Sequence, residues 1–340
     1  MMETFQLGPF TVPRLFVGLW QLSSNAWGTA PVGKIRTEMR RHIEEGFIAF
    51  DMVTVTSDHY GSAELLFGEF RAGLPNPDEV VGATKWCVFR PTVPTRAVVE
   101  AAVKERLVRM RGRSVDVLQF HWQDYNDKGY LEALRHLRDL QSEGVIKAIG
   151  LCNFDSIRTD EICTHLGTGA IVSNQVQFSL IDTRPLHGMG HVCEKHGIKL
   201  LTYGTLCGGF LSDEWLGKPE PEAYQGSITP SQRKYLDMIV KAWGNWELFQ
   251  SLLQILRDIG NKHGGVSIAN VATRWVLEHK FVGAVIVGTR MGIAAHTEDN
   301  QRVFNFNLTE GDKQAIEALL DQSNGRRLIT SIGDCGAEYR

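Results

Sequence analysis

Eight short apolar runs alternate with longer segments of helical period along this chain of 340 residues. The runs are nearly continuous in aliphatic and β-branched residues, which is typical of parallel strands covered on both faces. Eight such strands alternating with helices favour a (β/α)8 TIM barrel over a doubly wound sheet. The expected strands span residues 15–19, 47–51, 80–85, 115–121, 146–152, 171–177, 199–203 and 284–287. The expected helices span residues 34–46, 62–72, 94–111, 130–144, 156–166, 186–197 and 266–278.

The sequence is consistent with one barrel domain over residues 1–340, with a single long interruption after the seventh strand. In that interval, residues 217–230 are rich in Pro, Gly and polar residues, and residues 232–260 have the pattern of one or two helices. An insertion at this place in a barrel lies on the active-site face. The polar tail 325–340 is expected to run over the surface.

Composition argues against several classes of protein. The net charge of −3 and the 22% of charged residues give no reason to expect a nucleic acid or a membrane surface as partner. The N-terminal residues do not resemble a signal peptide, and no run of 18 apolar residues is present. The six cysteines are scattered without a CxxC pair, so we expect reduced thiols, a cytoplasmic protein and no metal site.

Four ionisable residues lie at or just after the ends of expected strands. They are Asp51, Tyr60, Lys85 and His121. A parallel barrel gathers the carboxyl ends of its strands on one face, so these side chains are expected to converge. A phenol, an ammonium, a carboxylate and an imidazole in one cleft form a site that can donate a proton.

Lys85 admits two chemistries, and a lysine that simply reaches water is the alternative to both. It could form a Schiff base with a carbonyl substrate. It could instead lower the pKa of Tyr60, which would then act as a general acid while Asp51 holds the lysine in a salt bridge. His121 is expected to orient a carbonyl by donating from a neutral imidazole nitrogen.

A nucleotide site of the common kinds is absent, because the chain has neither a GxGxxG motif after a strand nor a Walker loop. Polar residues at later strand ends offer another mode of binding. Asn153 and Gln175 could hold an amide, and Tyr203 offers a flat face for stacking. Gly288, Thr289 and Arg290 precede a helical stretch that ends at Asn300, which suggests a phosphate site.

Taken together, these segments resemble the aldo-keto reductase superfamily over nearly the whole chain. Each segment is weak alone, but their order and number carry the resemblance. They are FD at 50–51, DHYGSAE at 58–64, TK at 84–85, QFHW at 119–122, GLCNF at 150–154, NQVQ at 174–177, VGTR at 287–290 and EDN at 298–300.

The resemblance implies reduction of an aldehyde or ketone to an alcohol, with hydride from C4 of a nicotinamide and a proton from Tyr60. Asp51 and Lys85 would tune the acidity of Tyr60, and His121 would orient the carbonyl. The implied cofactor is NADP(H), with NAD(H) as the alternative. The residues implied to bind it are Asn153, Gln175 and Tyr203 at the nicotinamide, and Gly288, Thr289, Arg290, His296 and Asn300 at the phosphate end.

The chain departs from the family pattern in three places. Asp51 and Tyr60 are nine positions apart, four more than in the family, and the extra residues are roughly 53–56. A misplacement of about 1 Å within a site can cost about 10²-fold in rate. Cys152 replaces the usual serine, and Gly288-Thr289 stands where many members have Lys-Ser.

Three functions therefore remain open at the level of sequence. The first is a carbonyl reductase acting on a small-molecule substrate; the second is a catalytically impaired NADP(H)-binding sensor; the third is a Schiff-base lyase that uses Lys85. The substrate itself cannot be inferred, because loops build the pocket. Four tryptophans that would suggest an apolar or aromatic carbonyl compound are Trp20, Trp27, Trp86 and Trp122.

Overall fold

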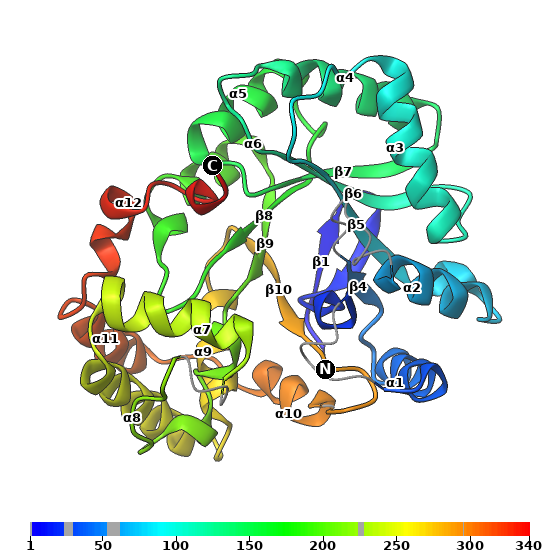
Figure 1. Ribbon diagram of the computed structural model, residues 1–340. Helices are drawn as coiled ribbons and strands as arrows, with labels where there is room; N and C mark the ends of the chain where they lie inside the picture. The colour runs from blue at the N-terminus through cyan, green and yellow to red at the C-terminus, as the bar shows by residue number, and fades with distance from the viewer. Residues whose placement is uncertain (1, 24–29, 53–61, 224–227, 295) are drawn as a thin grey trace.

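A closed barrel of eight parallel strands forms the centre of the molecule, as the sequence predicts (Figure 1). The computed structural model describes residues 2–23, 30–52, 62–223, 228–294 and 296–340. The last strand pairs with the first, so the sheet has no free edge. The barrel strands are β3 (Leu15–Gly18), β4 (Ala49–Asp51), β5 (Val81–Val88), β6 (Val115–Trp122), β7 (Ile146–Cys152), β8 (Ser173–Gln177), β9 (Lys199–Tyr203) and β10 (Val282–Gly288).

Helices surround the barrel and lie between consecutive strands (Figure 1). Their ends follow local capping: Thr95 accepts a hydrogen bond from Val98 N, so α3 begins at Arg96, and Gly197 adopts a left-handed conformation where α6 ends. These helices are α1 (Val32–Glu44), α2 (Ser62–Ala72), α3 (Arg96–Arg109), α4 (Gly129–Ser142), α5 (Ser156–Leu166), α6 (Met189–His196) and α9 (Ile268–Leu277). No helix in the described ranges is both long and apolar enough to cross a bilayer.

An antiparallel hairpin that we did not predict closes the amino-terminal end of the barrel. Its strands are β1 (Thr4–Leu7) and β2 (Phe10–Pro13), joined by a turn in which Gly8 has a φ of +57°. Leu7 and Val12 are fully buried against the small side chains of the barrel interior. With this end filled, the carboxyl ends of the strands are left to form a site.

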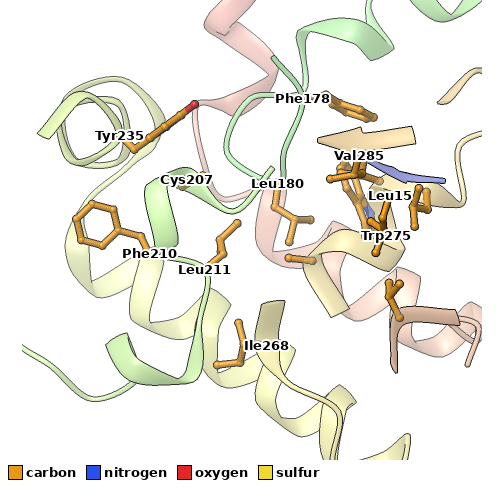
Figure 2. Close-up of a cluster of buried hydrophobic side chains, with 14 of the residues drawn as sticks. Leu15, Phe178, Leu180, Cys207, Phe210, Leu211, Tyr235, Ile268, Trp275 and Val285 are labelled. Carbon is orange, nitrogen blue, oxygen red and sulfur yellow. The ribbon is translucent and has the colours of Figure 1, made fainter. Parts of the chain in front are cut away.

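The interval after β9 contains helices, as expected. It comprises α7 (Pro230–Asp237), a π-helical segment at Met238–Trp243 and α8 (Trp246–Lys262). The apolar side chains of this interval belong to the largest hydrophobic cluster of the described residues, part of which Figure 2 shows. The same cluster includes Phe178, which follows β8, and Trp275 of α9, whose ring centroids lie 5.4 Å apart. The insertion is therefore packed against the barrel through a continuous core.

The prediction that residues 325–340 run over the surface holds for only part of the segment: six of these residues are exposed, whereas Gly325, Leu328, Cys335 and Gly336 are buried. After α10 (Thr297–Gln301) and α11 (Glu310–Leu320), the chain forms α12 (Leu328–Ser331) and returns to the barrel. Cys335 is only 1% exposed, and the Asp334 carboxylate accepts a hydrogen bond from Ser156 N at the start of α5. Some polar groups of the tail therefore pair with groups at the barrel, while others are exposed to solvent.

Candidate active site

Strand parity decides which residues face the barrel interior. On β5, Lys85 points inward and Trp86 outward; on β6, His121 points inward and Trp122 outward. Trp86 and Trp122 both pack on Phe120, in the layer between the sheet and the helices. Their predicted role in lining a substrate pocket is therefore wrong. Of the other two tryptophans, Trp20 is 36% exposed just after β3, and Trp27 lies outside the described residues.

A buried ion pair joins the end of β4 to Lys85, which lies within β5, three residues before the strand ends. Lys85 Nζ donates to Asp51 Oδ1 over 2.6 Å and to the Met52 carbonyl over 2.9 Å. A buried charge requires this kind of pairing. An ammonium engaged by a carboxylate and a carbonyl has no lone pair for attack on a substrate carbonyl, which argues against the Schiff-base lyase.

Two glutamine amides hold the other oxygen of the Asp51 carboxylate. Gln119 Nε2 donates to Asp51 Oδ2 over 2.7 Å, and Gln175 Nε2 donates to the same oxygen over 2.8 Å. Gln175 Nε2 also lies 2.7 Å from Gln119 Oε1. Gln119 was missed as a site residue, although the QFHW segment contains it and its inward parity with His121 could have indicated it.

The neutral form of His121 is fixed in one tautomer. Its Nδ1 lies 2.9 Å from the Cys152 carbonyl oxygen, which can only accept, so Nδ1 carries the proton. Burial lowers the pKa of His121 to about 4, and the bond to Cys152 offsets this only in part. At neutral pH, Nε2 is therefore an unprotonated acceptor, and among the described residues it has no partner. The expected donation from His121 to a carbonyl does not fit this geometry.

Two aromatic rings cover His121. Phe89, from the segment after β5, lies 5.1 Å from the imidazole between ring centroids, and Tyr339 lies edge-on at 6.0 Å. Tyr339 belongs to the returning C-terminal segment, so residues far apart in the sequence enclose the same imidazole. This contact follows from the path of the tail and could not be inferred from strand ends.

Asn153 occupies a strained position beside this segment. Its φ is +58°, a left-handed conformation that Asn tolerates better than most residues. The Tyr203 hydroxyl donates to Asn153 Oδ1 over 2.9 Å, and burial raises the pKa of Tyr203 well above its ordinary value. Gly336 touches Asn153 so closely that a Cβ there would lie 2.1 Å from its carbonyl oxygen.

An arginine within the barrel mouth anchors the C-terminal segment. The Arg184 guanidinium donates to both oxygens of Asp182, over 2.9 and 2.7 Å, and to both oxygens of Glu338, over 3.1 and 2.9 Å. Arg340 stacks on the Tyr125 ring at 3.8 Å from its centroid. These contacts hold the segment on the face where the site residues converge.

Comparison with known proteins identifies the family of this chain. The model of the Aldo/keto reductase family matches residues 14–321. The chain belongs to the aldo/keto reductase family. Members of this family reduce carbonyl groups with nicotinamide coenzymes.

Relatives in this family cover most of the chain at low identity. An aldo-keto reductase of Bacillus subtilis is 22% identical over 91% of this chain and 90% of its own length. The chloroplastic pyridoxal reductase of Arabidopsis thaliana is 25% identical over 94% and 87%. An NADH-specific methylglyoxal reductase of Escherichia coli is 22% identical over 79% and 82%.

Solved structures of family members share the fold. A glycerol dehydrogenase from Gluconobacter oxydans superimposes with a TM-score of 0.76 at 24% identity, covering 94% of this chain and 95% of that one. The holo form of an aldo-keto reductase from Bacillus halodurans gives 0.72 at 22% identity, covering 94% and 96%. At these identities the likeness establishes the fold alone.

The cysteine that departs from the aldo-keto reductase pattern is a buried, neutral thiol. Burial raises the pKa of Cys152 far above its ordinary value, and it raises that of Cys87 to about 11. All six cysteines are free and buried, as expected. Within the described ranges, no three His, Cys, Asp or Glu side chains are grouped so that they could hold a metal ion.

The segment expected to bind phosphate follows β10. Gly288 ends that strand, and a Cβ there would lie 2.2 Å from Gln21 Nε2, so the flexible Gln21 side chain would have to move to admit a larger residue. The Thr289 hydroxyl donates to the Gly18 carbonyl over 3.0 Å, so it is engaged by the barrel itself. Arg290 is exposed, and so is His296, which precedes α10, where Asn300 lies.

A hollow of about 370 Å³ lies between the start of α1 and the segment after Arg290. Lys34 lines it, a cation that the sequence patterns did not single out. Its lining comprises Gly33, Lys34, Thr37, Glu38, Gly292, Ile293 and Ala294. Tyr60 and the four-residue insertion lie outside the described residues.

Proposed function

We propose that this protein reduces the carbonyl group of a small aldehyde or ketone to an alcohol, using NADPH or NADH and a proton from Tyr60. The observation that carries the proposal is the buried Asp51–Lys85 pair beside His121, at the carboxyl end of the barrel. Family membership supplies the class of reaction. The substrate class stays at the level of a carbonyl compound, because the residues around His121 come from variable segments.

The free polar atoms of two residues fit a nicotinamide carboxamide. Both N–H groups of Gln175 are used inside the barrel, so its Oε1 is left to accept from the carboxamide NH₂. Asn153 Oδ1 accepts from Tyr203, so its Nδ2 is left to donate to the carboxamide oxygen. When bound there, the reduced nicotinamide supplies the hydride. The ring of Tyr203 offers a stacking face beside these amides.

Lys85 can act on Tyr60 because one of its donors is uncommitted. An ammonium has three N–H donors, and two of them go to Asp51 and Met52. The third is available to the phenol oxygen of Tyr60. A positive charge within hydrogen-bonding reach of a phenol lowers the pKa of the tyrosine and stabilises the phenolate left after proton donation.

His121 contributes through its Nε2 lone pair. At neutral pH this atom accepts a hydrogen bond, so it suits the hydroxyl of an alcohol product or a hydroxyl next to the carbonyl. Proton donation to the substrate oxygen is left to Tyr60.

The phosphate end of the coenzyme is assigned to the segment after β10. Gly288 and Thr289 supply backbone, Arg290 supplies a positive charge for a 2′-phosphate, and His296 and Asn300 flank the same segment. Lys34 in the adjacent hollow is a second candidate cation. Arg290 and Lys34 are both exposed and are not fixed in a buried ion pair at this place. Neither cation therefore commits the site to a 2′-phosphate, and the proposal includes both NADPH and NADH.

The proposal is tested with Tyr60→Phe. We expect the variant to lose carbonyl reduction and to bind NADPH and NADH with nearly unchanged affinity, as measured by fluorescence titration and by rates on an aldehyde panel. Full kcat in Tyr60→Phe would overturn the assignment of the proton donor.

The four extra residues between Asp51 and Tyr60 motivate a second candidate, a coenzyme-binding sensor with impaired catalysis. Coenzyme binding by the wild-type protein with no turnover of any aldehyde would favour this candidate. Deletion of residues 53–56 would then raise kcat, because it restores the family spacing.

A further inference from the structure

The two oxygens of the Asp51 carboxylate have hydrogen-bond partners of different chemical types. One oxygen takes the Lys85 ammonium, and the other takes the amides of Gln119 and Gln175. A carboxylate only accepts, so both amides must present their nitrogen to it. This requirement places the nitrogen of each amide at Asp51 without reference to any ligand, but one bond leaves the plane of each amide undetermined.

Gln119 then determines what Gln175 can offer. With Gln119 Nε2 on Asp51, its Oε1 takes the second N–H of Gln175 over 2.7 Å. Gln119 is fully buried on β6 and bonds to both Asp51 and Gln175, which also bond to each other. Gln175 has no donor left, and only its carbonyl oxygen remains for a ligand.

We propose that Gln119 is a positioning residue that locks Gln175 with its carbonyl oxygen toward the coenzyme and thereby ties the carboxamide site to the Asp51–Lys85 pair. The inference rests on the proposed function, since it names a further residue for the same site. Gln119 acts through its neighbours: among the described residues, its side-chain hydrogen-bond partners are Asp51 and Gln175, both in the barrel interior.

Removal of the Gln119 amide would release both neighbours. Gln175 would keep one bond to Asp51 and lose its second acceptor, so its nitrogen would stay at Asp51 while the plane of its amide, and with it the direction of Oε1, would no longer be fixed. Asp51 would lose one of its two amide donors. A buried N–H without an acceptor is costly, so the network would rearrange rather than persist with a gap.

A double-mutant cycle tests the coupling through Gln175. We expect Gln119→Leu to weaken NADPH or NADH binding about tenfold in the wild-type background, and less than about twofold in a Gln175→Leu background. Dissociation constants are measured by fluorescence titration on folded, purified variants. Equal losses in both backgrounds, or no loss in either, would overturn the inference.

A matched control comes from another buried barrel glutamine. Gln177 on β8 donates to Asp182 over 2.8 Å and accepts from Lys234 over 3.1 Å, and within the described part of the chain no hydrogen bond joins it to Asp51. Gln177→Leu therefore removes a buried amide from the same part of the fold. We expect its coenzyme affinity to stay within about twofold of wild type. A loss as large as that of Gln119→Leu would mean general loosening of the barrel and would overturn the positioning role.

Gln119→Glu tests the positioning role through the pH dependence of kcat, which a merely structural role of Gln119 would not change. An ionised carboxyl at this position repels Asp51, whereas a protonated one can donate to Asp51 as the amide does. We expect kcat relative to wild type to rise about tenfold or more as the pH is lowered from 8 to 5. A ratio that is flat across this range would contradict the inference.

The same titrations separate this inference from the function on which it rests. Coenzyme binding by the wild-type protein that is insensitive to Gln119→Leu overturns the role of Gln119 alone. Absence of NADPH and NADH binding by the wild-type protein overturns both the proposed function and the inference.

Discussion

His121 donates its Nδ1 proton to the main-chain carbonyl of Cys152 over 2.9 Å. The main chain of β7 therefore sets the tautomer of an imidazole on β6, before any substrate is present. Since burial keeps the imidazole neutral, its Nε2 faces the site as an acceptor. Both the pH dependence of stability and the preference among substrates should reflect this arrangement.

The first consequence concerns stability at low pH. The folded pKa of His121 is about 4 and its ordinary value is 6.5, so the unfolded chain binds more protons between these values. The contribution of neutral His121 to the free energy of unfolding is fully present above pH 6.5. It is lost as the pH falls toward 4, by about 3 kcal/mol in total. Denaturant unfolding of wild type and His121→Gln at pH 7.5 and 4.5 should show a smaller pH effect in the variant. If the free energy of unfolding changed equally with pH in the two proteins, the lowered pKa of His121 would be contradicted.

Substrate choice should depend on a donor beside the carbonyl. Hydroxyacetone can donate its hydroxyl hydrogen to Nε2, whereas methoxyacetone carries a methyl group in place of that hydrogen. If the protein reduces ketones as proposed, we expect kcat/KM to favour hydroxyacetone by about tenfold or more. His121→Leu should remove most of this preference, because it removes the acceptor. An equal preference in wild type and variant would show that other groups select the hydroxyl.

The buried pair predicts a recovery of stability in a double variant. Lys85→Met leaves the Asp51 charge uncompensated in the barrel, which should cost about 3–5 kcal/mol of the free energy of unfolding. Adding Asp51→Asn removes that charge, so the double variant should regain much of the loss while activity stays absent. If the two substitutions lowered the free energy of unfolding in guanidinium additively, a direct interaction between Lys85 and Asp51 would be contradicted.

Coenzyme preference is tested at the phosphate end. Arg290→Ala should weaken NADPH binding more than NADH binding, by about tenfold for a single charge-assisted contact to the 2′-phosphate. Titration of both coenzymes against the variant measures the difference. Equal losses would remove Arg290 from this role and direct attention to Lys34, for which Lys34→Ala is the matching variant.

The sequence predicted the parts of this protein that depend on local period. The eight strands and most helices follow from apolar runs and caps, and Asp51, Lys85 and His121 follow from strand ends. The sequence did not predict which face of a strand a side chain occupies, or where the C-terminal segment returns to the barrel. Trp86 and Trp122 face the helices because they alternate with Lys85 and His121.

The hairpin over the barrel floor and the inward path of the tail are nonlocal as well. Four-residue strands carry little periodic signal, so β1 and β2 were not recognised. Polar residues such as Asp334 and Glu338 look solvent-exposed in sequence, and only the fold supplies Ser156 and Arg184 as their partners. The tautomer of His121 likewise depends on a main-chain atom of a neighbouring strand.

The anchoring of the C-terminal segment should be separable from global stability. Glu338→Gln removes one charge from Arg184, which keeps both bonds to Asp182, so we expect a loss below about 1 kcal/mol in unfolding free energy. Amide hydrogens of residues 334–340 should nevertheless exchange faster, because the segment loses its charge-assisted anchor. Arg184→Met is the contrasting variant: it leaves the buried Asp182 charge unpaired and should cost about 3–5 kcal/mol. Unchanged exchange in Glu338→Gln would show that Arg340 and Asp334 hold the segment without this ion pair.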